Sequence, residues 1–206
     1  NASFPDLYVQ SGNKPLRSWL PAGTLPDTPR IPENMIITGM FKGGMQDLVT
    51  ELQLESDYAN AGINAHLVNI TDSIRSSYTL SIPHFRANPG VMLYDTTFGW
   101  MSGKMSATGQ GYTIKQMVAK AVLQLDEANY NAYTYHNINI NAGINKGDFE
   151  AQGESADTGI TANFAISGRL ADTTIQALKV NMEMAKSDLY ATHWYPETVT
   201  LKGNIN

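Results

Sequence analysis

The chain has 206 residues, of which 42% are hydrophobic and 16% charged, so it is long enough for one or two domains and carries fewer charges than usual. Its formal net charge of -5 argues against a nucleic-acid partner, because no excess of cations is present to neutralise phosphates. The sequence has no cysteine, which excludes disulfides and thiolate metal sites, and no apolar run approaches the roughly 18 residues that span a bilayer.

Residues 1–34 hold most of the prolines of the chain. Prolines at this spacing disfavour both helix interiors and the ladder positions of a sheet. We therefore expect an extended lead-in, followed by a repeated antiparallel β-sheet segment over 35–206. The prolines of the lead-in are Pro5, Pro15, Pro21, Pro26, Pro29 and Pro32.

Short strands are predicted from residue 35 onward, because apolar residues recur at every second position between turn residues. The first runs over 35–40 and turns at 41–44, and a later one starts at 91–97. Between them, the apolar positions that indicate strands are Leu48, Leu52, Leu54, Ile63, Ala65, Leu67, Tyr78, Leu80 and Ile82.

The segment 113–125 is ambiguous. Its apolar residues fit the three-to-four spacing of an amphipathic helix, which periodicity favours, and they also fit one face of a strand that would include Ala121 and Leu123.

The stretch 129–170 has the clearest two-residue alternation in the chain. Ile138, Ile140 and Ile144 alternate with asparagines, which predicts a strand with one apolar face. Turn residues at 145–148 and 157–159 separate it from two further strands of the same pattern, the second of which carries Phe164 and Ile166 on its apolar side. The pattern resumes after residue 170 at Leu178, Val180, Met182, Met184, Leu201 and Ile205.

Catalytic signals are weak throughout. The four histidines lie far apart in the sequence, without the spacing that places two imidazoles on one metal ion. The glycine-rich stretches lack the third glycine or the lysine that nucleotide-binding loops require. We therefore predict a protein that is not an enzyme, with no cofactor, no metal site and no catalytic residue.

Two architectures fit an all-β chain of this pattern. Pattern alone favours a closed β-sandwich, in which a second layer covers the apolar face. The alternative is an extended antiparallel sheet curled into a trough whose apolar inner face stays open to acyl chains.

Several motifs resemble the TamB-type translocation and assembly module of the AsmA-like superfamily, in its Bacteroidetes branch. Residues 30–43 resemble the family's entry motif LPxxIxLxGxxxG, and 130–149 resemble its YNgYtY stretch with Ala132 in place of the usual glycine. Residues 157–168 and 188–203 are similar to two further segments, so the likeness extends over most of 30–206.

The resemblance implies a taco-like β-sheet with a hydrophobic groove, and with it a strand rather than a helix in 113–125. It also implies a periplasmic fragment of an envelope-biogenesis protein, anchored in the inner membrane by an N-terminal helix that precedes this sequence. The implied role is movement of phospholipid acyl chains between the inner and outer membranes. An alternative is a scaffold for outer-membrane protein assembly or secretion by β-strand pairing, with a β-barrel assembly protein or client as partner.

The trough predicts a set of lipid-binding residues on its apolar face. A third alternative, a carbohydrate-binding module, would use Trp19, Trp100 and Trp194. The predicted lipid-binding residues are Leu52, Leu54, Ile63, Leu67, Leu80, Ile138, Ile140, Ile144, Phe164, Ile166, Leu178, Val180, Met182, Leu201 and Ile205.

Overall fold

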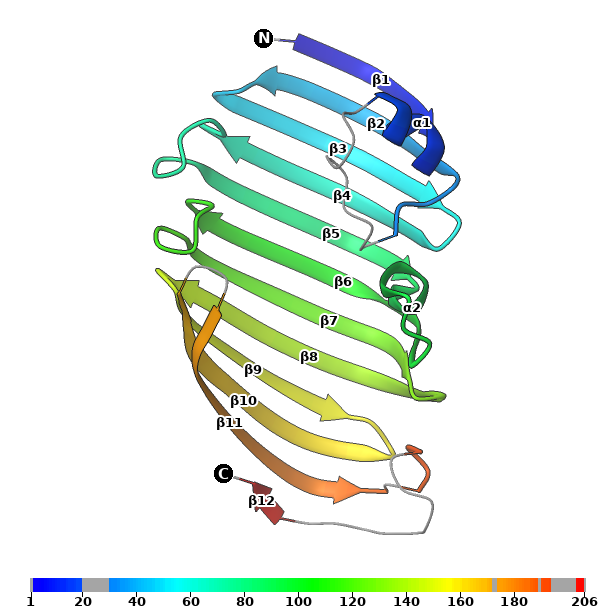
Figure 1. Ribbon diagram of the computed structural model, residues 1–206, viewed down its shortest axis with the longest axis vertical. Coiled ribbons are helices and arrows are strands. Elements are labelled where there is room, and N and C mark those ends of the chain that lie inside the picture. Colours follow the sequence, from blue (N-terminus) through cyan, green and yellow to red (C-terminus); the bar gives the residue numbers. More distant parts are fainter. Residues whose placement is uncertain (1, 20–29, 172–173, 189, 194–202, 206) are drawn as a thin grey trace.

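Over the residues that the structure describes, the chain is all-β apart from two short helices, and its strands form one antiparallel sheet in which each strand pairs with its neighbours in the sequence (Figure 1). The structure is a computed structural model that describes residues 2–19, 30–171, 174–188, 190–193 and 203–205. No helix within these ranges is long and apolar enough to cross a membrane. The strands are β1 (Ala2–Ser11), β2 (Met35–Gly44), β3 (Asp47–Ser56), β4 (Ala59–Val68), β5 (Ser77–Ala87), β6 (Phe98–Gln110), β7 (Val118–Tyr130), β8 (Tyr133–Asn145), β9 (Asp148–Ala156), β10 (Ile160–Ala171), β11 (Thr174–Ser187) and β12 (Gly203–Ile205).

The sheet is open, with β1 at one end of the strand order and β12 at the other. The part of the chain that the structure describes contains this single sheet, so the sandwich alternative, which needs two, is not the architecture. Successive connections alternate between the two long rims, and the two helices lie at the right rim in Figure 1. In the same view β10 and β11 bend along their length.

Two-residue turns set the register of the long hairpins. Lys146 and Gly147 have φ values of 51° and 95°, and Asn145 pairs with Asp148 across this turn. Positive φ at both central positions matches the right-handed twist of the flanking strands. The predicted hairpin at 145–148 and the predicted break at 157–159 are both confirmed.

The ambiguous segment 113–125 divides at residue 118. β7 begins at Val118 and runs to Tyr130, so the strand assignment is confirmed from that residue on. Residues 113–117 form the loop before it, in which the amides of Gln116 and Met117 both donate to the Thr113 carbonyl. The local helical spacing is overridden by ladder bonds to β6 and β8 on either side.

The expectation for residues 1–34 is wrong over β1 and the helix α1 (Asn13–Trp19). β1 pairs with β2, and Pro5 falls at the register shift between Phe4 and Leu7 on this outermost strand. A proline is tolerated there, because an edge strand and a bulge both relieve the need for a backbone donor.

The expected strand over 91–97 is also wrong. Pro89–Leu93 forms the helix α2, and the next strand starts later, at Phe98. The side chain of Asn88 accepts a 3.2 Å hydrogen bond from the Val91 amide, and Pro89 stands at the start of the helix. An N-cap followed by proline is a helix-start signal, which here outweighs the apolar character of the segment. The expected turn at 41–44 likewise lies within β2, and the chain turns instead at Met45 and Gln46.

Candidate functional site

The register of the sheet determines which residues share a face, because partners across antiparallel strands point to the same side. Ile140 of β8 pairs with Leu123 of β7 and with Gly153 of β9. Gly153 in turn pairs with Phe164 of β10, whose partner on β11 is Met182. One line of partners therefore joins predicted lipid-binding residues from three different strands.

The same tracing places the other described members of the set on this side of the sheet, which we call the apolar face. In the first half of the sheet, Leu52 pairs with Ile63, and Leu67 pairs with Tyr78. Ile205 pairs with Met182 through its backbone, and Leu201 lies outside the described residues. The residues traced to the apolar face are Leu52, Leu54, Ile63, Leu67, Leu80, Ile138, Ile140, Ile144, Phe164, Ile166, Leu178, Val180 and Met182.

These thirteen side chains are only partly covered. Eleven are half-buried, while Leu178 and Val180 on β11 are exposed by 58% and 43%. The few buried apolar residues of the described chain include Leu48 and Leu125, which lie on the same face. The side chains of the apolar face are thus covered mainly by their neighbours on the same sheet.

Aromatic rings cover glycines on the apolar face. A Cβ built on Gly153 would lie 2.1 Å from Cζ of Phe164, and one on Gly168 would lie 2.6 Å from Cζ of Phe149. Each glycine leaves room for the ring of its cross-strand partner to lie over the backbone. In both pairs the ring therefore lies against the backbone of the glycine.

A line of small side chains crosses the same face. Ala107, Ala121, Ala142 and Ala151 are successive partners on β6, β7, β8 and β9. On β7 and β8 the neighbouring line of partners is larger, with Leu123 and Ile140. The alanine line therefore forms a strip of low side chains that runs across the strands.

The sequence prediction missed the contribution of β6, although a weak signal was present. Met105 pairs with Leu123, and Ala107 pairs with Ala121, so both lie on the apolar face. In β6 small residues alternate with Ser, Lys and Thr, which dilutes the apolar periodicity that identifies other strands.

Over β8 to β11 the opposite face carries mainly polar side chains. A hollow of about 510 Å³ lies over β8 to β11, lined mainly by side chains from this polar face and by few from the predicted set. Asn139 donates a 3.1 Å hydrogen bond to Glu154 there. The lining residues include Asn139, Asn141, Gln152, Glu154, Asn163, Asn181 and Glu183.

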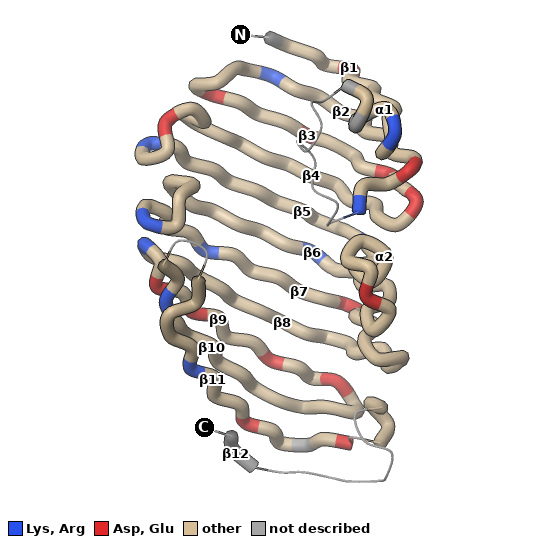
Figure 2. Tube along the Cα trace, in the orientation of Figure 1, with Lys and Arg blue, Asp and Glu red and all other residues tan. Residues whose placement is uncertain are grey.

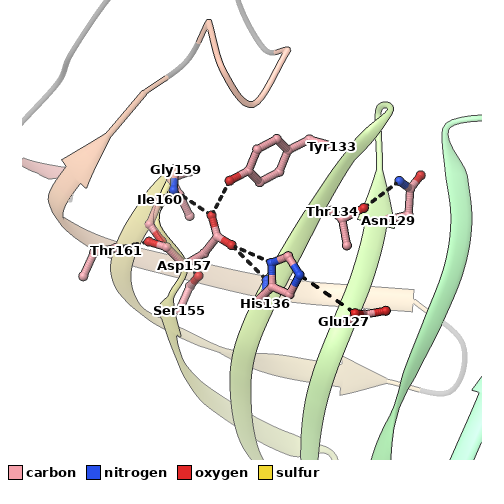
Figure 3. Close-up of polar contacts among 10 residues, drawn as sticks. All are labelled: Glu127, Asn129, Tyr133, Thr134, His136, Ser155, Asp157, Gly159, Ile160 and Thr161. Carbon is pink, nitrogen blue, oxygen red and sulfur yellow. Dashed lines mark hydrogen bonds and ion pairs between the residues drawn. The ribbon is translucent and has the colours of Figure 1, made fainter.

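One buried carboxylate organises the end of the sheet where β9 turns into β10 (Figure 3). The side chain of Asp157 is 1% exposed, and its Oδ1 accepts 2.7 Å hydrogen bonds from the Tyr133 hydroxyl and the Gly159 amide. Its Oδ2 accepts a 3.0 Å bond from the His136 amide and lies 3.3 Å from Nδ1 of the same residue. The carboxylate thereby ties the turn to the start of β8.

Burial and hydrogen bonding act on Asp157 in opposite directions. Burial raises the pKa of this carboxyl, but the hydrogen bonds from Tyr133, Gly159 and His136 outweigh that effect, so the pKa lies below its ordinary value of 3.8. Burial together with the hydrogen bond to Asp157 raises the pKa of the Tyr133 hydroxyl.

Two of the four histidines, His66 and His136, contact carboxylates. Nε2 of His136 lies 4.0 Å from Glu127, and Nε2 of His66 lies 2.8 Å from Asp47. Within the described ranges no group of three or more His, Asp or Glu side chains is placed to hold a metal ion. Among the described contacts, none places a nucleophile beside His136 and Asp157 in a catalytic arrangement. The Asp157 network therefore fits a structural role.

Comparison with protein-family models, with curated proteins and with solved structures gives no match to this chain.

Proposed function

We propose that the apolar face carries lipid acyl chains, in a periplasmic segment of an envelope-biogenesis protein of the TamB type. The observation that carries the proposal is the register, which brings thirteen predicted residues from six strands to one side of the sheet, eleven of them half-buried and two exposed. Exposing such a surface to water is unfavourable. Acyl chains that cover it would gain about 0.8 kcal/mol of binding free energy per buried methylene.

The proposed mechanism is passive, with no catalytic residue. The sheet would curl around the acyl chains as a trough, with the apolar face on the inside. The rings over Gly153 and Gly168 smooth the surface, and the alanine line offers a path across the strands. Because the surface changes little from strand to strand, a lipid would move along it with small changes in free energy.

In the full protein this path would lead from an inner-membrane anchor toward the outer membrane, with head groups remaining in water. The role in the envelope is proposed from the sequence resemblance. The apolar face supports the lipid-binding part of the proposal.

The experiment compares two carboxylates introduced one residue apart. Ile140→Asp places a charge on the apolar face, and Asn141→Asp places the same charge on the polar face of the same strand. Fluorescent fatty-acid and phospholipid uptake should be lost in Ile140→Asp and retained in Asn141→Asp, with both variants folded by thermal melts. Native mass spectrometry of detergent-free protein should show copurifying lipid.

Two results would contradict the proposal. One is wild-type protein that is free of lipid and takes up none. The other is an Ile140→Asp variant that unfolds, since this would mean that the side chain is enclosed in a core where an unpaired carboxylate costs several kcal/mol.

A second candidate function is supported by the strand edges. Among the described residues β11 has a partner on its outer side only over Met182–Met184, and its Ile175 and Leu178 are exposed by 56% and 58%. An unpaired edge can accept a strand from an outer-membrane client. Photo-crosslinkers at Ile175 would trap client protein under this function, whereas crosslinkers at Ile140 would trap lipid under the first.

A further inference from the structure

One rim of the sheet is a continuous row of loops. The connections β2–β3, β4–β5, β6–β7 and β8–β9 all lie at the left rim in Figure 1. We call residues 45–46, 69–76, 111–117 and 146–147 the turn rim.

Backbone hydrogen bonds link each of these loops to the next. The Ile70 amide donates to the Met45 carbonyl at 3.0 Å, and the Gly111 amide donates to the Ser76 carbonyl at 2.9 Å. The Lys146 amide donates to the Met117 carbonyl at 2.7 Å. The turn rim is therefore one connected surface.

Large apolar side chains project from the turn rim into solvent. Met45 is 64% exposed, Ile74 is 67% exposed and Tyr112 is 51% exposed. They come from three different loops, which the backbone bonds hold in a row.

Cations accompany these apolar tips. The turn rim contains Arg75, Lys115 and Lys146 against the single anion Asp72, a net charge of +2. Asp72 accepts hydrogen bonds from the Ile74 and Arg75 amides at 2.9 and 3.0 Å, and its Oδ2 lies 3.5 Å from Nε of Arg75 in an ion pair. Figure 2 shows blue segments recurring along this rim, with red segments between them where strands begin, as at Asp47 and Asp148.

At the opposite rim the fully described loops hold no cation, although the described part of the β1–β2 connection there carries Lys14, Arg17 and Arg30. These four loops, 57–58, 88–97, 131–132 and 157–159, contain three aspartates and neither Lys nor Arg, a net charge of -3. The opposite rim also exposes apolar side chains, Leu93 at 48% and Tyr94 at 66%, and Cζ of Arg30 lies 5.9 Å from the centre of the Tyr94 ring. The turn rim and these four loops thus differ in charge more than in apolar exposure, within a chain whose formal net charge is -5.

We infer that the turn rim docks on the surface of an anionic phospholipid bilayer. Exposed apolar side chains enter the boundary between head groups and acyl chains, while neighbouring Lys and Arg side chains meet the lipid phosphates. Tyrosine suits this depth, because its ring is apolar and its hydroxyl polar. Docking would lay the long axis of the sheet along the membrane, and it uses residues separate from those of the apolar face.

The test is sedimentation of the whole chain with vesicles of phosphatidylcholine alone, and with vesicles of equal parts phosphatidylcholine and phosphatidylglycerol. Wild-type protein should bind the mixed vesicles, bind phosphatidylcholine much more weakly, and dissociate as salt is raised. Arg75→Glu with Lys146→Glu should weaken binding to the mixed vesicles by about tenfold or more. Ile74→Ser with Tyr112→Ser should weaken it as well.

Leu93→Ser with Tyr94→Ser is the matched control, since it removes exposed apolar side chains from the opposite rim and should leave binding unchanged. Far-UV circular dichroism checks that each variant is folded, and Lys146→Glu alone serves if a double variant is not. Equal binding to both vesicle types, or wild-type binding by the folded turn-rim variants, would overturn the inference. Ile140→Asp should bind vesicles normally, so failure of lipid carriage is distinguishable from failure of docking.

Discussion

The hydroxyl of Tyr133 donates a 2.7 Å hydrogen bond to the carboxylate of Asp157, across 24 residues of sequence. It joins the first residue of β8 to the turn that follows β9. The β8–β9 hairpin is therefore held at its open end by this bond and at its other end by the turn of Lys146 and Gly147.

Asp157→Asn should destabilise the protein by about 1–3 kcal/mol. The amide keeps the size of the side chain but replaces one acceptor oxygen by a donor, which leaves at least one buried N–H group of the network without a partner. Urea unfolding measures the effect. Asp126→Asn, at an exposed position of β7, is the control and should change stability by less than about 0.5 kcal/mol. Equal effects of the two changes would show that the network contributes nothing.

Acid should weaken the protein through the same carboxylate. The pKa of Asp157 is lowered in the folded state, so its ionised form contributes stability that is fully present above the ordinary value of 3.8 and is lost as pH falls through the lower folded value. The difference in unfolding free energy between wild type and Asp157→Asn should therefore shrink below about pH 4. Urea melts from pH 6 to pH 2 test this, and a constant difference would contradict it.

Two glycines should respond oppositely to alanine. Gly39 has a φ of 140°, and a Cβ there would lie 2.0 Å from the Glu51 carbonyl oxygen, so Gly39→Ala should cost more than about 1 kcal/mol. Around Gly143 the nearest atoms lie 3.7 Å from a built Cβ, so Gly143→Ala should be neutral or stabilise by about 0.4–1 kcal/mol. Thermal melts of the two variants, both in β-strands, measure the contrast; a Gly39→Ala protein as stable as wild type would refute it.

The alanine line should be sensitive to bulk. Ala121→Trp places a large ring in the middle of the strip, where it would obstruct an acyl chain without adding charge. Val122→Trp places the same ring on the opposite face of β7, where the native side chain is already 38% exposed. Lipid-transfer rates between vesicles should fall for Ala121→Trp and stay near wild type for Val122→Trp. Equal rates in both variants would exclude the strip as the path.

The strand content of the chain was predictable, because apolar side chains recur at every second position along many of the strands. The alternation at Ile138, Ile140 and Ile144 identified β8 and its hairpin directly. Where the pattern was diluted by glycine and serine, as in β6, the strand was missed. The helix α2 was missed because Asn88 and Pro89 specify a helix start while the residues after them read as a strand.

The apolar face followed from the same alternation, since register extends a face from one strand to the next. The Asp157 network did not. Its donors come from Tyr133, His136 and Gly159, and only the hairpin geometry brings the first two within reach of the carboxylate. Likewise, the charge of the turn rim depends on every second connection falling on the same side, which becomes visible once the strand order is known.

The sequential strand order has a consequence for how the molecule opens. Because each strand pairs only with its neighbours in sequence, stability is set by a chain of nearest-neighbour interfaces, as in a one-dimensional lattice. Loss of β1 or of β11 and β12 leaves the interfaces further inward unchanged, so opening should proceed from the two ends. Amide hydrogen exchange should accordingly be slowest in β5 to β8 and increasingly fast toward β1 and β11. The centre of the sheet would then be its most stable part, and the two ends would unfold locally most often.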